Sequence, residues 1–421
     1  MQPRPTTHWP SILLAILSIM GILAMFSCGM FLLLRDALAI AQPALIPNTA
    51  ASAGDDILLP GGLFLCVALL LPALYYSLRR LNGKPIPTVT IRPIRVWQAI
   101  VILAFWLSAI LSGYMLETSL NAGWLMTTLL YLPAIALPVL TLAWIGLGGL
   151  PLGSRQRFWS TFGVGMLAGP GLAAMLEFLI YLGFVVLSLL LLAAHPEWMA
   201  AFNQIKSQLS STQDLDTLLM VIAPYLMNPL VILLAIAVMS GLVPLIEELV
   251  KPIPVWLMAG RLHSPAQGFA LGALSGAGFA LVEGLVAASS VGEDWGALAV
   301  ARAGGSLMHI LTTGLMGWGI ASAWQERRIL RLLGLYGLSV LIHSAWNALT
   351  VMIVFGSLRV FLVRSTYSAG NQPDALGVLL SITGAVMLVI LSALTLITLL
   401  LVNRKLRPPG RPCAAPTRSA G

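Results

Sequence analysis

Long apolar stretches recur along this chain, and they constrain its fold more than any other feature. Each is close to or longer than the roughly 20 residues that a helix needs to cross a bilayer. Only 9% of the 421 residues are charged, whereas soluble domains carry about 25%, so too few charges exist to build a water-soluble surface. The clearest stretches are 11–34, 57–77, 97–116, 124–147, 220–242, 267–290, 329–355 and 375–402.

These stretches predict an all-α, polytopic transmembrane helical bundle of about 10–12 spans, because only helices satisfy the backbone polar groups of such segments in lipid. Two regions leave the count open. Segment 158–194 is too long for one ordinary span and carries a Gly-Pro-Gly breaker at 169–171, so it is either one tilted helix or a hairpin. Segment 218–260 is expected to hold two helices, joined near 240–241 or a few residues earlier.

The net charge of +8 does not indicate a nucleic-acid partner, because the basic residues lie at the ends of the apolar segments. This is the pattern of loops kept on the cytoplasmic side. It predicts a multi-pass protein of the plasma membrane, with both termini cytoplasmic and an even number of spans. The basic residues are Arg79, Arg80, Lys84, Arg92, Arg95, Arg327, Arg328, Arg331, Arg404, Lys405, Arg407, Arg411 and Arg418; acidic residues Asp55, Asp56, Glu293 and Asp294 fall in loops between them.

Ionisable residues at membrane depth concentrate between residues 244 and 347. A charge at the bilayer centre costs at least about 2.5–3.5 kcal/mol, so the cheapest arrangement is for these side chains to converge on one interior site. They are Glu247, Glu248, Lys251, Glu283, His309 and His343, with Asn347 beside them, on four consecutive predicted helices. Earlier in the chain, Glu177 is the only carboxylate well inside an apolar segment, where it either helps to pack helices or lies near an interface.

Helical spacing supports a shared site. Glu247 and Lys251 are four residues apart, so they lie on one helix face, as do His343 and Asn347. Glycines at 268, 272 and 276 form a stripe that allows a neighbouring helix to pack closely. Each of these residues also has a purely structural interpretation. A Glu–Lys pair is often a neutralised structural pair, and a histidine near an asparagine often joins two helices. A glutamate can also lie at the membrane face in contact with solvent.

Glutamate and histidine in a secluded, partly wet site suit the activation of water, with one group as base and others stabilising an oxyanion. Ser306 and Ser344 are the nearest serines; neither lies in a Gly-x-Ser-x-Gly turn, and no cysteine accompanies the cluster. A serine or cysteine nucleophile is therefore not expected. No cofactor is favoured; zinc is the alternative, since two histidines and a glutamate can hold it, with ligands from Glu247, Glu248, Glu283, His309 and His343.

The order of four motifs resembles the PrsW family of intramembrane proteases, which is similar to the type II CAAX prenyl endopeptidases and to a non-catalytic subunit of γ-secretase. The motifs are Glu247-Glu248-x-x-Lys251, Phe279-x-x-x-Glu283, His309-x-x-x-x-Gly314 and His343-x-x-Trp346-Asn347. The resemblance covers about a quarter of the chain. One departure is Gly284, where many relatives carry asparagine.

The resemblance implies endoproteolysis of membrane-anchored proteins, such as an anti-sigma factor, with Glu247 and Glu248 activating water. It implies that His309, His343 and Asn347 orient the water or stabilise the oxyanion, and Lys251 is expected to tune the charge of its neighbours. The family has been described both as metallopeptidases and as metal-independent glutamic proteases, and the glutamic type is favoured here. Two rivals stay open: an ion- or proton-coupled transporter and a non-catalytic scaffold.

The chain is divided accordingly into four regions. Residues 1–236 form an N-terminal accessory transmembrane region, and residues 237–356 form the protease-like core, a bundle of four helices. Residues 357–402 supply a loop and a last transmembrane helix. Residues 403–421 are expected to be a basic, disordered cytoplasmic tail.

Overall fold

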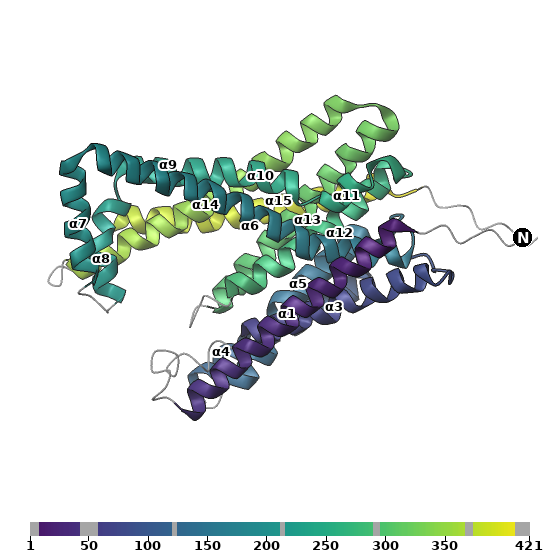
Figure 1. Cartoon of the computed structure of the whole chain (residues 1–421), viewed down its shortest axis with the longest axis horizontal. Helices are drawn as coiled ribbons and strands as arrows, with labels where there is room; N and C mark the ends of the chain where they lie inside the picture. The colour runs from purple at the N-terminus through teal and green to yellow at the C-terminus, as the bar shows by residue number, and fades with distance from the viewer. Residues whose placement is uncertain are drawn as a thin grey trace, which may run out of the picture.

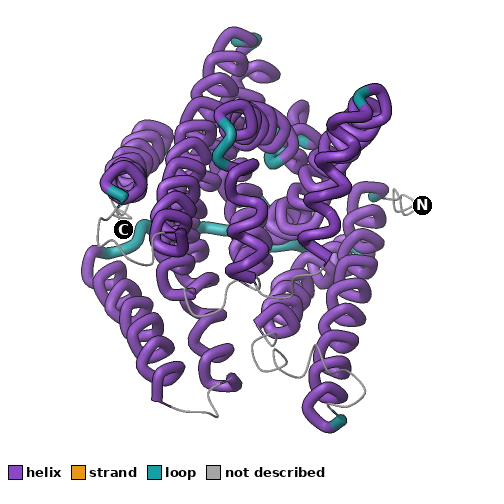
Figure 2. Tube along the Cα trace, turned by 90° about the vertical axis from the view of Figure 1, so that its left-hand side faces the viewer, coloured by secondary structure: helices purple, strands orange, loops and turns teal. Residues whose placement is uncertain are grey.

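The computed structural model of the chain describes residues 8–42, 58–119, 124–210, 215–288, 295–366 and 374–408. Within them, helices joined by short loops make up the structure (Figure 2), and an isolated bridge between Thr88 and Ser154 is the one extended pairing. The helices are α1 (Trp9–Ala41), α3 (Leu58–Leu81), α4 (Val96–Ser119), α5 (Trp124–Leu147), α6 (Arg155–Ala194), α7 (Pro196–Ser210), α8 (Leu215–Leu226), α9 (Pro229–Ala237), α10 (Val243–Val250), α11 (Ile253–Leu257), α12 (Pro265–Ala288), α13 (Trp295–Glu326), α14 (Ile329–Thr366) and α15 (Ala375–Leu406), with a π-helix at Val238–Leu242 and a 3₁₀ turn at Ala259–Arg261.

Nine helical segments of the described chain are long and apolar enough to cross a membrane, which confirms the polytopic helical bundle. The number is below the 10–12 expected. Segment 158–194 is a single helix, α6, which continues through Pro170. Helix α8 is only 12 residues long, and α13, although 32 residues long, is not among the nine.

The region 218–260 does hold two elements, but they join earlier than expected. The break falls between Leu226 and Pro229, where the Asn228 side chain accepts a hydrogen bond from the Leu230 N–H and caps α9. At 240–241 the chain continues as a π-helix, so residues 229–257 form one span.

Helix α12 lies at the centre of the bundle (Figure 1), where it packs against α13, α6 and α5. Its predicted glycine stripe faces α13, and the close packing is confirmed. A Cβ atom at Gly268, Gly272 or Gly276 would collide with backbone oxygens of α13. On the opposite face, a Cβ atom at Gly278 would lie 2.6 Å from the Phe162 carbonyl oxygen of α6. Both neighbours therefore approach α12 at backbone distance.

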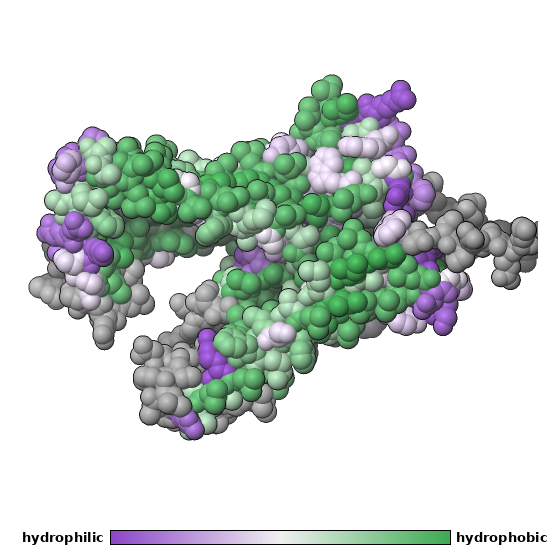
Figure 3. Space-filling model, in the orientation of Figure 1, coloured by the Kyte–Doolittle hydropathy of each residue, from purple (hydrophilic) through white to green (hydrophobic). Residues whose placement is uncertain are grey.

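The outward faces of the long helices carry exposed apolar side chains, as a lipid-facing surface requires. On α6 these include Phe178, Val185 and Leu190, and on α15 Val389 and Leu401. In the view of Figure 3, hydrophobic residues cover the long sides of the molecule and hydrophilic residues gather toward the ends. This distribution supports an integral membrane protein.

Basic segments far apart in sequence meet at one end of the bundle. Asn403 donates hydrogen bonds to the carbonyl oxygens of Gly146 and Gly148, and the Gly149 N–H donates to Ile91 in the basic loop. The ammonium of Lys405 lies 5.5 Å from the ring centroid of Trp318 on α13. These contacts join the basic loop, the end of α13 and the end of α15.

Helix α15 extends to Leu406, so the first residues of the predicted 403–421 tail are helical. The remainder of that tail from residue 409, the acidic residues Asp55, Asp56, Glu293 and Asp294, and the start of the chain lie outside the described residues.

Candidate functional site

Helix α10 carries both glutamates of the first motif and ends at Val250, with Lys251 as its C-cap. The Lys251 N–H donates to the Glu247 carbonyl oxygen over 2.8 Å, and Pro252 then stops the helical ladder. The carbonyl of Lys251 would be left unpaired by this ending; it accepts a 2.6 Å hydrogen bond from the Ser275 hydroxyl of α12. The motif is thus anchored to the most buried helix of the bundle.

The Lys251 ammonium is the centre of the cluster and is completely buried. It lies 2.8 Å from Glu247 Oε2 and 2.9 Å from Glu248 Oε1. Nδ1 of His309 is 2.7 Å away and Nδ1 of His343 is 3.3 Å away. One side chain therefore connects residues from α10, α13 and α14.

The hydrogen-bonding roles of His309 follow from these neighbours. An ammonium can only donate, so Nδ1 of His309 accepts from Lys251. The proton of the neutral ring is then on Nε2, which donates to Glu283 Oε2 over 2.7 Å. Glu283 is held from its other side by Arg302, with nitrogen–oxygen distances of 2.8 and 3.1 Å. Both nitrogens of His309 are occupied by protein groups.

His343 has one occupied nitrogen and one freer nitrogen. Nδ1 lies 2.9 Å from Glu248 Oε1, while Nε2 lies 3.9 Å from Glu247 Oε2. That second distance is too long for a direct hydrogen bond. It is short enough for one water molecule to bridge the two atoms.

The carboxylates differ in their access to solvent. Glu248 is fully buried, whereas the side chain of Glu247 is 11% exposed and that of Glu283 is 36% exposed. Three carboxylates thus face two permanent cations, Lys251 and Arg302, within one buried network. Each carboxylate has at least one cationic partner there, as buried ionic groups require.

The structure brings six of the seven predicted site residues into this network. Asn347 lies at its edge, where its amide donates a 2.7 Å hydrogen bond to the Met239 carbonyl oxygen. That carbonyl belongs to the π-helix preceding α10. Asn347 therefore holds the widened turn from which the Glu247-Glu248 helix starts.

Two charged residues of the site were not assigned to it from sequence. Arg302 was missed, although it lies seven residues before His309, and therefore close to the same helical face. Glu177 of α6 was expected either to help pack helices or to lie near an interface, but its carboxyl group lies near enough to Glu247 to interact with it electrostatically. No sequence pattern connects α6 with α10, so the proximity of these two residues could not be predicted from the sequence.

Metal binding is a question of donor type and of space. Glu247, His309 and His343 offer one carboxylate oxygen and two imidazole nitrogens, all within 4.8 Å of one another. These donors suit zinc. The Lys251 ammonium, however, lies among them and contacts all three. A metal ion would fit this group only after Lys251 had withdrawn, so the arrangement present here holds a cation of its own.

Comparison with known proteins agrees with the predicted resemblance. A family model described as "PrsW family intramembrane metalloprotease" matches residues 154–369, just over half of the chain. The matched region starts at α6 and includes every residue of the network described above. No curated protein and no solved structure matches the chain.

Proposed function

The chain belongs to the PrsW family of intramembrane proteases, and we propose that it cleaves membrane-anchored protein substrates with water activated by Glu247. The observation that carries this proposal is the 3.9 Å separation of Glu247 Oε2 and His343 Nε2 inside the ionic network, where the two side chains are 11% and 3% exposed. The substrate is a peptide segment inside or next to the bilayer.

In this mechanism Glu247 is the general base. A water molecule held between Glu247 and His343 attacks the carbonyl carbon of the scissile bond, and its proton passes to the Glu247 carboxylate. The same proton then goes to the amine that leaves as the C–N bond breaks. The atoms balance: one water and one peptide bond give one carboxyl and one amine.

The other residues position this pair. Glu248 orients the His343 ring through Nδ1, in the way that a buried carboxylate orients a catalytic histidine. Lys251 fixes both glutamates, and the Glu283–Arg302 pair fixes His309. His309 has no nitrogen left for substrate, so its role is to hold Lys251 rather than to bind the oxyanion directly.

A zinc-dependent protease is the second candidate, favoured by the 4.8 Å grouping of Glu247, His309 and His343. In that case the three side chains would hold the ion, and the ion would lower the pKa of a bound water. The two candidates share residues and differ in their response to chelator.

The deciding experiment uses the full chain purified in detergent and incubated with single-span peptides, including one that carries the membrane segment of an anti-sigma factor. Mass spectrometry of the products reports cleavage. Glu247→Gln should abolish it, whereas the matched variant Glu326→Gln, at the end of α13 where Glu326 pairs with Arg331, should cleave normally. Cleavage by Glu247→Gln at the normal rate would refute the proposed base, and uptake of a solute without cleavage would favour a transporter.

A further inference from the structure

A pocket with both charged and apolar lining residues lies outside the proteolytic network. It has a volume of about 720 Å³ and opens between the start of α1, the end of α3, the start of α6 and α11 with the following turn. Cavities of this size accommodate small ligands. None of the network residues lines it, so its chemistry has to be considered separately.

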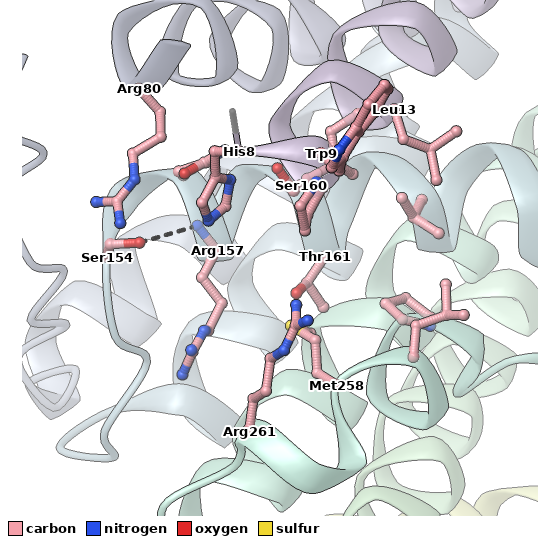
Figure 4. A pocket seen from close by; sticks show the side chains of 16 residues that line it. His8, Trp9, Leu13, Arg80, Ser154, Arg157, Ser160, Thr161, Met258 and Arg261 are labelled. Carbon is pink, nitrogen blue, oxygen red and sulfur yellow. Dashed lines mark hydrogen bonds between the residues drawn. The ribbon is translucent and has the colours of Figure 1, made fainter. Parts of the chain in front are cut away.

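Three arginines line the pocket: Arg80, Arg157 and Arg261. Figure 4 shows the side chains of Arg157 and Arg261 extending toward the same space from α6 and from the turn after α11. None of the described residues lining the pocket is Asp or Glu. In the described part of the chain no carboxylate forms an ion pair with any of the three. This concentration of positive charge calls for an anion.

Two hydroxyl groups at the pocket wall also lack partners. Ser160 is 6% exposed and Thr161 is 1% exposed, and both line the pocket. Neither hydroxyl oxygen makes a hydrogen bond within the described residues. Buried hydroxyls are normally satisfied, so a ligand bearing acceptor oxygens would complete them.

The remaining wall is apolar, with Trp9, Leu13, Val164 and Leu257 among the lining residues. A small inorganic anion would leave this wall uncovered, whereas an amphiphile would cover both parts. Arg80 belongs to the last turn of α3, so the pocket lies at the end of an apolar helix and next to the basic loop. Basic pockets between transmembrane helices are typical sites for anionic lipid headgroups.

We propose that this pocket binds an anionic phospholipid. The phosphate contacts Arg157 and Arg261 and accepts hydrogen bonds from Ser160 and Thr161, and an acyl chain covers the wall formed by Leu13, Val164 and Leu257. The site is independent of the proteolytic network, so it holds whether or not the proposed base is correct.

The test measures lipid binding to the full chain by native mass spectrometry in detergent. Phosphatidylglycerol should bind at lower concentration than phosphatidylcholine of the same acyl composition. The variants Arg157→Gln and Arg261→Gln should each weaken phosphatidylglycerol binding by roughly fivefold. Arg95→Gln is the matched control, because it removes the same charge from the basic loop outside the pocket, and it should leave binding unchanged.

The proposal would be overturned by equal binding of the two lipids to the unmodified chain, by equal loss in Arg95→Gln and the pocket variants, or by binding of inorganic phosphate alone as tightly as phosphatidylglycerol. A soluble acidic peptide that displaces phosphatidylglycerol at equal concentration would also overturn it, by showing a peptide site. The comparison of lipids on the unmodified chain decides the question even if a pocket variant does not fold.

Discussion

Lys251 Nζ lies 2.7 Å from His309 Nδ1, although the two residues are 58 positions apart in the sequence. The contact fixes the ring so that its other nitrogen faces Glu283, and it connects the helix of paired glutamates with α13. A cation at this position makes the cluster one network instead of two separate ion pairs. Substitutions within the network should therefore affect residues that they do not touch.

Glu247→Gln and Glu248→Gln should both reduce the cleavage rate, by about 10²–10⁴-fold for Glu247 as the general base. They should differ in stability. Gln at position 247 loses one ion pair with Lys251 and should destabilise the fold less than Gln at the fully buried position 248, which weakens contacts to both Lys251 and His343. The expected cost there is about 1–3 kcal/mol. Cleavage assays and unfolding in detergent measure the two effects; equal rates for both variants and the unmodified chain would show that the glutamates are structural.

Lys251→Met should be strongly destabilising. From sequence, Lys251 is expected only to tune its neighbours, and a mild effect would follow. The structure instead buries its ammonium among two carboxylates and two imidazoles, and removing one partner of a buried ionic group costs about 3–5 kcal/mol. The double variant Lys251→Met, Glu248→Gln should recover part of this loss, because it also removes a buried charge. A double variant no more stable than the single one would contradict this account.

Arg302→Gln should slow cleavage by about 10–100-fold, the effect usual for a residue that orients a functional group through another. Without Arg302, Glu283 loses the partner that holds it against His309. Arg359→Gln is the control. Arg359 lies on the later part of α14, roughly 24 Å along the helix from His343, and pairs with Asp374 over 2.7 Å. If both arginine variants slowed cleavage equally, the effect would be one of general stability.

Chelator should leave cleavage unchanged, because Lys251 occupies the space among the three candidate ligands. Activity should be compared before and after dialysis against chelator, with the zinc content of the protein measured in parallel. Loss of activity restored by added zinc would show that Lys251 moves out and that the site is metallic. In that event the same residues would act, but as ligands.

Reporter fusions at Lys84 and Arg404 should give the same side of the membrane, and that side should be the cytoplasm. The structure joins the two basic segments at one end of the bundle, and loops rich in Lys and Arg stay on the cytoplasmic side. Fusions at Tyr75 of α3 and at Lys405 would serve as internal checks of insertion. Reporters on opposite sides would contradict the proposed orientation.

Much of the site could be predicted because exposing a charged side chain to lipid is costly, so such residues are expected in the protein interior. Glu247, Glu283, His309 and His343 each stand out against an apolar background, and the cost of exposing them to lipid points to a common interior location. The close packing of a helix against the glycine stripe of α12 could also be predicted, since small residues four apart indicate a close helix neighbour. Local spacing and burial cost were sufficient for these features.

Other features depended on tertiary packing. Whether the Gly-Pro-Gly at 169–171 ends a helix depends on its neighbours, and α6 continues through it beside α12. The proximity of Glu177 to Glu247 brings together α6 and α10, two helices with no common sequence motif. The start of α9 could have been found, because Asn228 followed by Pro229 is a typical helix N-terminus. The role of Asn347 could not, since its partner is a main-chain carbonyl that the sequence does not distinguish.

The backbone contact between α12 and α13 also bears on how a substrate reaches the site. At Gly276 the neighbouring atom of α13 is the carbonyl oxygen of His309 itself, so the two helices touch beside the proteolytic network. A transmembrane substrate is about 10 Å wide as a helix, and no lateral passage of that width can open along this seam without separating the glycines. We therefore expect substrate to approach by another route, and a cross-link between α12 and α13 should leave cleavage intact.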